Sequence, residues 1–281
     1  MKKLLIKNTH AFHWEIIESV IVKYAEILQF DSKTVLDIYL HVAHNDSFKK
    51  YITAKYPHVK FENISDYDYF IDCTVYDKDI TKLDSKLSNK KYIAHEITNR
   101  LQLNPNVYFL TPLSGNRFIY ADVLPLMEQK KASNIPIYII QGHLNGGRRN
   151  LNLLKKILDN DYKYDFKIKL LGRGAYPKEM VKYKNKILLK NNLNFMDYHK
   201  EFLDGYCILP LISKETHAQY YSCKLTSTIN YARAYKLKSL IDKDLQDIYN
   251  LENTYVYNNI NDIVLLFEKS LESFYNMKKL N

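Results

Sequence analysis

The chain has 281 residues, of which 46% are hydrophobic and 26% charged, so it is long enough for two domains with substantial cores. With only 7 glycines and 7 prolines, its composition excludes a disordered or a fibrous protein. The formal net charge of +10 favours anionic partners, which include nucleic acid, an anionic membrane surface and phosphorylated small molecules.

The first half of the chain alternates short apolar strands with amphipathic helices. The clearest helix is predicted over 13–28, where isoleucine and valine recur on one side at helical spacing. Strands are predicted at 4–6, 35–42, 59–64, 69–75, 91–94 and 107–110, with a second helix at 48–56 and a helical end to the segment 116–129. This alternation predicts an α/β fold with a mostly parallel sheet covered on both faces.

A polar segment at 130–134 separates the two patterned halves. We place the domain boundary there, so that residues 1–132 form one domain and residues 133–281 the other. In the second half, strands are predicted at 136–141, 166–171, 186–189, 206–209, 238–241 and 254–257, with a helix at 150–158 and a closing helix at 262–278 that can pack back on the first domain. Two such halves predict a cleft between them, where ligands of α/β sheets usually bind.

Two glycine-rich turns follow successive predicted strands of the second half. The first runs from Gly142 to Gly147 and leads directly into Arg148 and Arg149, and the second is Gly172-Arg173-Gly174. Glycines let the backbone approach a ligand, a helix start offers free N–H groups, and paired guanidinium groups can hold phosphate oxygens. A single turn of this kind also occurs where nothing binds, but the two in tandem favour a site for a nucleoside diphosphate.

The order of motifs over 135–270 resembles the donor-binding domain of retaining GT-B glycosyltransferases of the group 1, family 4 type. The likeness is one of pattern more than of residue identity. In chain order it rests on Arg148-Arg149 opening a helix, the turn Gly172–Gly174, the segment 194–199, Glu215 five residues after Pro210, and the segment 230–234 leading into a strand.

This resemblance implies two Rossmann-like domains, an acceptor-side one followed by a nucleotide-sugar-binding one. It implies a hexosyltransferase that needs no metal and no cofactor, and that moves a sugar, with retention, from a UDP- or GDP-sugar to a glycan, lipid-linked or protein acceptor in glycan biosynthesis. The residues implied are catalytic His95, Arg148, Arg149 and Glu215; donor-binding Gly146, Gly147, Gly172, Gly174, Phe195, Tyr198, Thr226, Ser227 and Asn230; and acceptor-side His10 and His13.

Departures from the family pattern leave other functions open. The family usually carries a second glutamate eight positions after the first, but here an insertion follows Glu215 and Asn230 occupies the equivalent place. The loop 8–13 also lacks the glycines often found there. One alternative is therefore a degenerate, non-catalytic nucleotide- or anion-binding module of this fold. Another is a sugar-nucleotide epimerase, for which Glu96 is the obvious additional acid.

Other short motifs carry weaker signals. Metal-ligand spacing occurs in the pairs Asp66/Asp68, Asp77/Asp79, His10/His13 and His41/His44. Such pairs arise easily in a chain with 31 acidic residues, and the histidine pairs have no third ligand at suitable spacing, so we predict no metal site. The positive residues are dispersed and no reader motif is present, so no specific nucleic-acid partner is expected.

The three cysteines, Cys73, Cys207 and Cys223, are far apart in sequence and form no C-x-x-C pair, which indicates free thiols in a reducing compartment. No apolar run has the length of a signal peptide or a transmembrane helix. We therefore expect a cytoplasmic protein whose basic surface allows peripheral contact with an anionic membrane.

Overall fold

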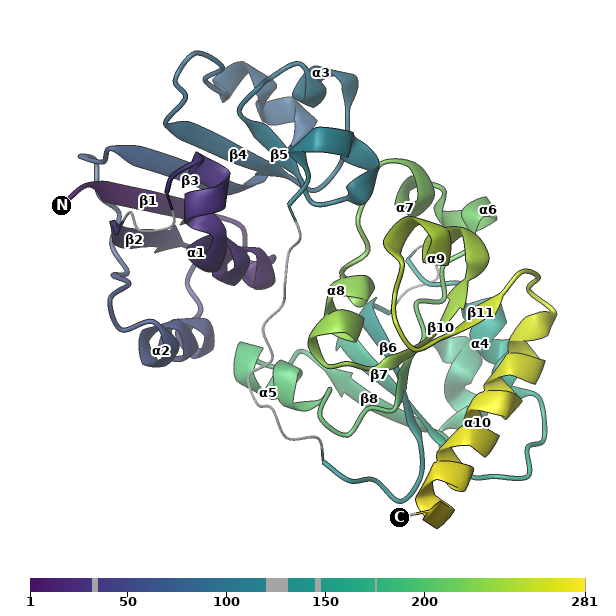
Figure 1. Cartoon of the computed structure of the whole chain (residues 1–281). Helices are drawn as coiled ribbons and strands as arrows, with labels where there is room; N and C mark the ends of the chain where they lie inside the picture. Colours follow the sequence, from purple (N-terminus) through teal and green to yellow (C-terminus); the bar gives the residue numbers. More distant parts are fainter. Residues whose placement is uncertain (32–34, 120–130, 145–147, 175, 281) are drawn as a thin grey trace. The chain divides into compact units, whose positions relative to one another are not determined.

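The computed structural model describes residues 1–31, 35–119, 131–144, 148–174 and 176–280. The chain divides into two compact units: unit 1 is Met1–Leu124 with Ser222–Leu225, and unit 2 is Pro125–Tyr221 with Thr226–Asn281. Each unit is built on one parallel sheet accompanied by helices (Figure 1). The predicted α/β class with two Rossmann-like sheets is confirmed.

Unit 1 carries a five-stranded sheet in the order β2-β1-β3-β4-β5, in which all neighbours are parallel. Its strands are β1 (Lys3–Asn8), β2 (Asp37–Val42), β3 (Tyr69–Val75), β4 (Lys90–Ala94) and β5 (Val107–Phe109). Its helices are α1 (Trp14–Leu28), α2 (Asp46–Lys55) and α3 (Asn99–Gln102), with short 3-10 turns at Asp77–Lys82 and Pro112–Arg117.

Helix α1 forms because its apolar residues recur at helical spacing and can all be buried on one side. Ile16, Ile17 and Val20 are each at most 1% exposed, and burial of each contributes about 1.5–3 kcal/mol. The helix ends at Gln29, which takes a left-handed conformation (φ 59°) and donates its backbone N–H to the carbonyls of the last turn. Burial of this side holds α1 against the rest of unit 1.

The strand predicted over 59–64 is wrong. Only Lys60 pairs with the edge strand β2, through its N–H to the Ile38 carbonyl (2.9 Å) and its carbonyl to the Leu40 N–H (2.7 Å). Glu62 and Asn63 are exposed, so the segment has no continuous apolar face to bury and the pairing stops after one bridge. The helical end predicted for 116–129 falls mostly on 120–130, outside the described residues.

Unit 2 carries a six-stranded parallel sheet in the order β11-β10-β9-β6-β7-β8. Its strands are β6 (Ile137–His143), β7 (Lys167–Arg173), β8 (Ile187–Asn191), β9 (Cys207–Ile208), β10 (Lys238–Asp242) and β11 (Thr254–Tyr257). Its helices are α4 (Leu151–Leu158), α5 (Phe195–Lys200), α6 (Lys214–His217), α7 (Gln219–Ser222), α8 (Ser227–Ala234), α9 (Lys243–Tyr249) and α10 (Asp262–Leu280), with a 3-10 turn at Lys178–Tyr183.

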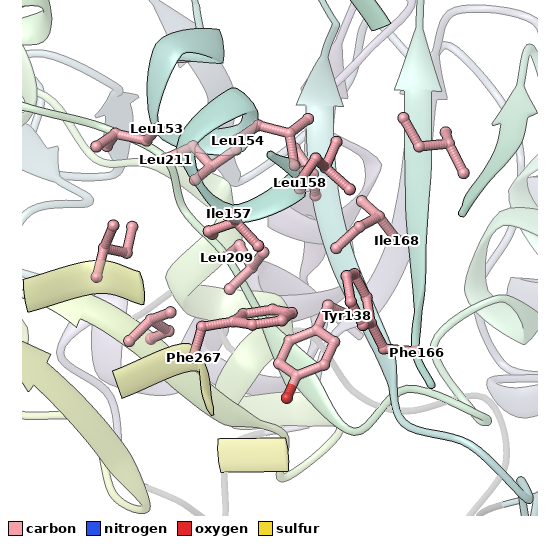
Figure 2. Packing of buried hydrophobic residues seen from close by; sticks show 14 of the residues in the cluster. Tyr138, Leu153, Leu154, Ile157, Leu158, Phe166, Ile168, Leu209, Leu211 and Phe267 are labelled. Carbon is pink, nitrogen blue, oxygen red and sulfur yellow. The ribbon is translucent and has the colours of Figure 1, made fainter. Parts of the chain in front are cut away.

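The core of unit 2 joins α4 and α10 to the sheet (Figure 2). The rings of Tyr138 on β6 and Phe267 on α10 lie 4.3 Å apart between centroids, and Leu154 and Ile157 of α4 belong to the same cluster. The Tyr138 hydroxyl is bonded to Ser270 Oγ at 2.5 Å, so the one polar atom of that ring is satisfied. This packing fixes β6, whose carboxyl end carries the candidate site.

All three cysteines are free thiols, as predicted, and two of them are buried. Within the described part of the chain, every helix is too short or too polar to cross a bilayer.

Candidate functional site

The carboxyl ends of β6 and β7 approach each other closely at two glycines. A methyl group on Gly172 would overlap the carbonyl of Gly142, and a methyl group on Gly142 would overlap the guanidinium of Arg149. Gly142 also has φ 116°, a conformation that side chains with a Cβ disfavour. The first glycine turn is therefore required so that Arg149 can fold back onto the end of β6.

Arg149 is buried, with only 4% of its surface exposed. Its Nε donates to the Gln141 carbonyl at 3.1 Å, Nη1 to the Arg148 carbonyl at 2.6 Å, and Nη2 to Thr228 Oγ1 at 3.4 Å as well as to the Gln141 carbonyl. None of these acceptors carries a charge, and no acidic side chain of the described residues pairs with it. Burial lowers the pKa of Arg149 below its ordinary value, but a guanidinium remains charged at neutral pH. A buried cation without a counter-ion attracts an anion.

The side chain of Gln141 ties the start of α8 and helix α5 to this strand end. Its Nε2 donates to Tyr198 Oη at 2.7 Å and to Ser227 Oγ at 3.3 Å, and its Oε1 accepts from Thr228 Oγ1 at 3.0 Å. Thr226, the residue before α8, makes no capping bond with its side chain. Because the first N–H groups of a helix have no acceptor within it, the positive end of α8 adds to the charge of Arg149.

The predicted arginine pair is unequal. Arg148 is exposed, and its Nη1 donates to Tyr220 Oη at 3.4 Å. We expected both guanidinium groups to present a fork to phosphate, but four N–H groups of Arg149 are already bonded to acceptors within the protein. Arg149 therefore supplies mainly charge to this site, while Arg148 has the exposure to move toward a ligand.

The remaining predicted donor residues are more scattered. Phe195 is buried in α5 against the ring of His199 (4.5 Å), and Asn230 is buried in α8 with its Nδ2 unpaired among the described residues. Gly174 follows β7 and accepts a hydrogen bond from Asn191 Nδ2 at 3.2 Å. Gly146 and Gly147 lie outside the described residues.

Glu215 is not brought to the arginines by any contact in the structure. It is exposed on the one-turn helix α6, where its neighbour Lys214 pairs with Asp244 at 3.0 Å. Burial, and to a lesser degree the charges of Asp242 and Glu215, raise the pKa of Tyr257. The charge of Glu215 therefore acts on the end of β11.

Unit 1 brings together the three histidines predicted for it. The rings of His13 and His95 stack at 3.6 Å between centroids, at the carboxyl ends of β1 and β4, and His10 stacks on Phe12 at 5.1 Å. Burial, followed by the charges of His95 and His10, lowers the pKa of His13 to about 2, and burial lowers the pKa of His95 to about 3. Both imidazoles are neutral at pH 7, and His13 Nδ1 and His95 Nε2 are buried without a hydrogen-bond partner among the described residues.

The acidic and histidine pairs show no metal geometry. Within the described residues, no three His, Cys, Asp or Glu side chains lie close enough together to hold an ion. Asp66 pairs with Lys3 at 2.9 Å and Asp77 with Arg100 at 3.0 Å, as surface carboxylates commonly do. His41 and His44 line a hollow of about 190 Å³ at the end of β2.

The sequence matches no protein-family model and no curated protein. Three solved structures share the fold over most of their length. AviGT4, a glycosyltransferase involved in avilamycin A biosynthesis, has a TM-score of 0.60 at 9% identity over 97% of this chain and 88% of its own. HepE from Anabaena, solved with UDP and glucose, has a TM-score of 0.62 at 10% identity, and the match covers 98% of this chain and 91% of HepE. A Listeria monocytogenes protein proposed to be a UDP-N-acetylglucosamine 2-epimerase has a TM-score of 0.51 at 7% identity, and the match covers 97% of this chain and 88% of that protein.

The chain has the GT-B fold. At such low identities the likeness concerns the fold alone, and it spans both Rossmann-like units.

Gln141, His217 and Tyr220 also lie near this site, although no sequence motif assigns them a role. A signal for Gln141 was present, because a single polar residue ends an otherwise apolar strand immediately before a glycine. His217 and Tyr220 lie in the insertion after Glu215, where no periodicity indicates which side chains are buried. The structure buries both of them, next to the turn that carries Arg148 and Arg149, called the arginine turn below.

Proposed function

We propose that the protein is a metal-independent glycosyltransferase that moves a sugar from a nucleoside-diphosphate sugar to a hydroxyl group of a glycan, lipid-linked or protein acceptor. The observation that carries the proposal is the buried charge of Arg149, which has no acidic partner among the described residues and adjoins the uncapped start of α8. The GT-B fold supports the reaction class, and the bound UDP and glucose of HepE support the class of donor.

Sugar transfer breaks the bond between the anomeric carbon and a phosphate oxygen. Positive charge develops on the sugar ring, as in glycoside hydrolysis, and negative charge develops on the leaving diphosphate. Arg149, Arg148 and the first N–H groups of α8 would stabilise that diphosphate, aided by the backbone at Gly172 and Gly174. Preorganised positive charge of this kind lowers the barrier because it need not reorganise as the bond breaks.

The other predicted residues receive roles within the same proposal. Phe195 and Tyr198 would face the base, and Glu215 and Asn230 would bind hydroxyl groups of the donor, Asn230 through its unpaired amide. The imidazoles of His10, His13 and His95 would accept or donate hydrogen bonds to sugar and acceptor hydroxyls. Retention of configuration at the anomeric carbon belongs to the proposal through the family resemblance. The net charge of +10 supports an anionic or membrane-associated acceptor.

Nucleotide binding tests the proposal. UDP, GDP and ADP, and their sugars, are added at about 1 mM while thermal unfolding is followed, since a ligand at about one hundred times its Kd raises the free energy of unfolding by about 2.7 kcal/mol. At least one nucleotide should raise the Tm of the wild-type protein and of R100Q, which alters an exposed arginine of unit 1, but not that of R149Q. Failure of every nucleotide to stabilise the wild type contradicts the proposal.

An epimerase is the second candidate because the Listeria monocytogenes protein shares the fold. Glu96, the acid such an enzyme would need in unit 1, follows His95 and pairs with Lys224 at 3.6 Å. Incubation of each nucleotide sugar without an acceptor, followed by proton NMR, separates the two activities. A transferase leaves the sugar configuration unchanged, whereas an epimerase yields the epimeric nucleotide sugar.

A further inference from the structure

His217 is a buried histidine with one unsatisfied ring nitrogen. It ends helix α6 and is 1% exposed. Its Nδ1 is bonded to Thr216 Oγ1 at 2.6 Å, whereas its Nε2 is buried and has no partner among the described residues. A buried polar atom left without a hydrogen bond costs free energy, so the position calls for a partner. A ligand that supplies this bond is one way to offset the cost.

A continuous series of hydrogen bonds links His217 to the arginine turn. Asn150, the residue after Arg149, donates from Nδ2 to Ser213 Oγ at 3.3 Å, and Ser213 Oγ lies 2.7 Å from Thr216 Oγ1, the partner of His217. The His217 N–H also donates to the Ser213 carbonyl at 2.8 Å. The ring is therefore held in one orientation relative to the segment that carries both arginines.

The charged groups that act on His217 are positive. Burial, and then the charges of Arg149 and Arg148, lower its pKa below the ordinary value, so the ring is neutral at pH 7. The ring of Tyr220, which accepts a hydrogen bond from Arg148, lies 6.3 Å away between centroids. On α6 itself, Lys214 and Glu215 are both exposed, and Lys214 pairs with Asp244. Tyr220 thus contacts both the His217 ring and Arg148, and the charges that act on the ring are those of the two arginines.

We propose that His217 Nε2 is a third ligand of the diphosphate, beside Arg148 and Arg149, and that the imidazole takes up one proton from solvent when the diphosphate binds. The inference rests on the proposed function and adds a dependence on pH to it. An anion within a few ångströms favours the charged imidazole, reversing the effect of the two arginines. The Thr216 hydroxyl can either donate to Nδ1 or accept from it, so it suits both protonation states. No covalent bond forms or breaks in this step.

Isothermal titration calorimetry measures the proton directly. Whichever of UDP, GDP and ADP binds the wild-type protein most tightly is titrated at about pH 6 and about pH 8, in pairs of buffers with different ionisation enthalpies. H217Q keeps a neutral donor but cannot be protonated, and H58Q alters an exposed histidine of unit 1. Ionisation of the nucleotide's phosphate and the heat of dilution are the same for all three proteins. A difference in proton uptake between the proteins therefore reports on His217.

The wild type and H58Q should take up about one more proton per nucleotide than H217Q near pH 6, and H217Q should bind about tenfold more weakly there. Near pH 8 the affinities should converge. The His217 Cε1–H resonance of the wild type provides a second readout that needs no variant protein in the complex, because it should move to the imidazolium position when nucleotide is added at pH 6.

The outcomes separate the two proposals. Equal proton uptake and equal affinity in wild type and H217Q, with a His217 resonance that stays neutral, overturn this inference and leave the proposed function standing. A histidine with only a structural role would lower the Tm of H217Q without changing proton uptake. Absence of binding by the wild type to all three nucleotides overturns the proposed function, and this inference with it.

Discussion

The arginine turn of unit 2 and the histidine cluster of unit 1 occupy equivalent places, each at the carboxyl ends of parallel strands, but they carry opposite chemistry. Unit 2 buries a guanidinium, which stays charged, against neutral acceptors. Unit 1 buries imidazoles, and burial lowers the pKa of His13 to about 2 and that of His95 to about 3, so they stay neutral. The same topology therefore places a buried positive charge in one unit, which we propose binds an anion, and neutral imidazoles in the other, which we propose bind hydroxyl groups.

The largest effect is expected from removing the buried charge of unit 2. R149M keeps a long apolar side chain but no cation, and we expect its turnover number in sugar transfer to fall roughly hundredfold to thousandfold. R149K, which keeps the charge without the planar fork, should lose less. R100M, a change in an exposed arginine of unit 1, serves as the control. Comparable turnover in R149M and R100M would contradict the assignment.

The next effect concerns the glycine that makes room for Arg149. In G142A the new methyl group overlaps the Arg149 guanidinium, and alanine must also adopt the unfavourable φ of 116°. We therefore expect a loss of about 2–4 kcal/mol in the free energy of unfolding. G115A is the control, because Gly115 also has a positive φ (69°) but nothing within 4 Å of the added methyl group, so it should lose only the backbone strain of about 1–3 kcal/mol, less than G142A loses. Urea unfolding of both variants measures the difference. Equal losses would show that Arg149 can move aside freely.

Histidine burial in unit 1 predicts how stability depends on pH. The folded-state pKa of His95 (about 3) lies below its unfolded value of about 6.5, so the unfolded chain binds more protons between these values. The contribution of neutral, buried His95 to the free energy of unfolding is fully present above pH 6.5. It is lost as the pH falls below 6.5, by up to about 1.4 kcal/mol per pH unit for a fully buried group. In urea unfolding, the free energy of unfolding of the wild type should decline between pH 6.5 and 4. H95Q should show a smaller decline, whereas H58Q should show the same decline as the wild type. A wild-type stability that is constant over this range would contradict the burial of His95.

The smallest effect is expected when a negatively charged side chain is introduced beside Arg149. Gln141 and Arg149 share Thr228 Oγ1 as a partner, so a carboxylate in Q141E would lie close to the guanidinium. We expect nucleotide affinity to fall about tenfold, because the acid competes with phosphate for the same charge. Q141A removes the amide without adding charge, and separates the electrostatic effect from loss of the hydrogen bonds to α5 and α8. Equal affinities for Q141E and Q141A would remove the electrostatic explanation.

The sequence predicted the strands of both sheets and the arginine turn, because apolar runs and glycines are local signals. The strand predicted at 59–64 failed because pairing depends on a neighbouring edge, and Lys60 alone meets β2. The polar residue near the end of β6 signals a role for Gln141, but its partners cannot be predicted, since Ser227 is 86 residues away and the two meet only in the folded unit. Which arginine is buried likewise depends on the fold of the turn and not on the Arg-Arg pair itself.

A crystal structure of the protein with a bound nucleoside diphosphate decides whether Arg149 belongs to a diphosphate site. The phosphate oxygens should lie within hydrogen-bonding distance of the Arg149 guanidinium and of the first N–H groups of α8. A nucleotide bound elsewhere, with Arg149 still bonded only to the Gln141 and Arg148 carbonyls and Thr228, would contradict it.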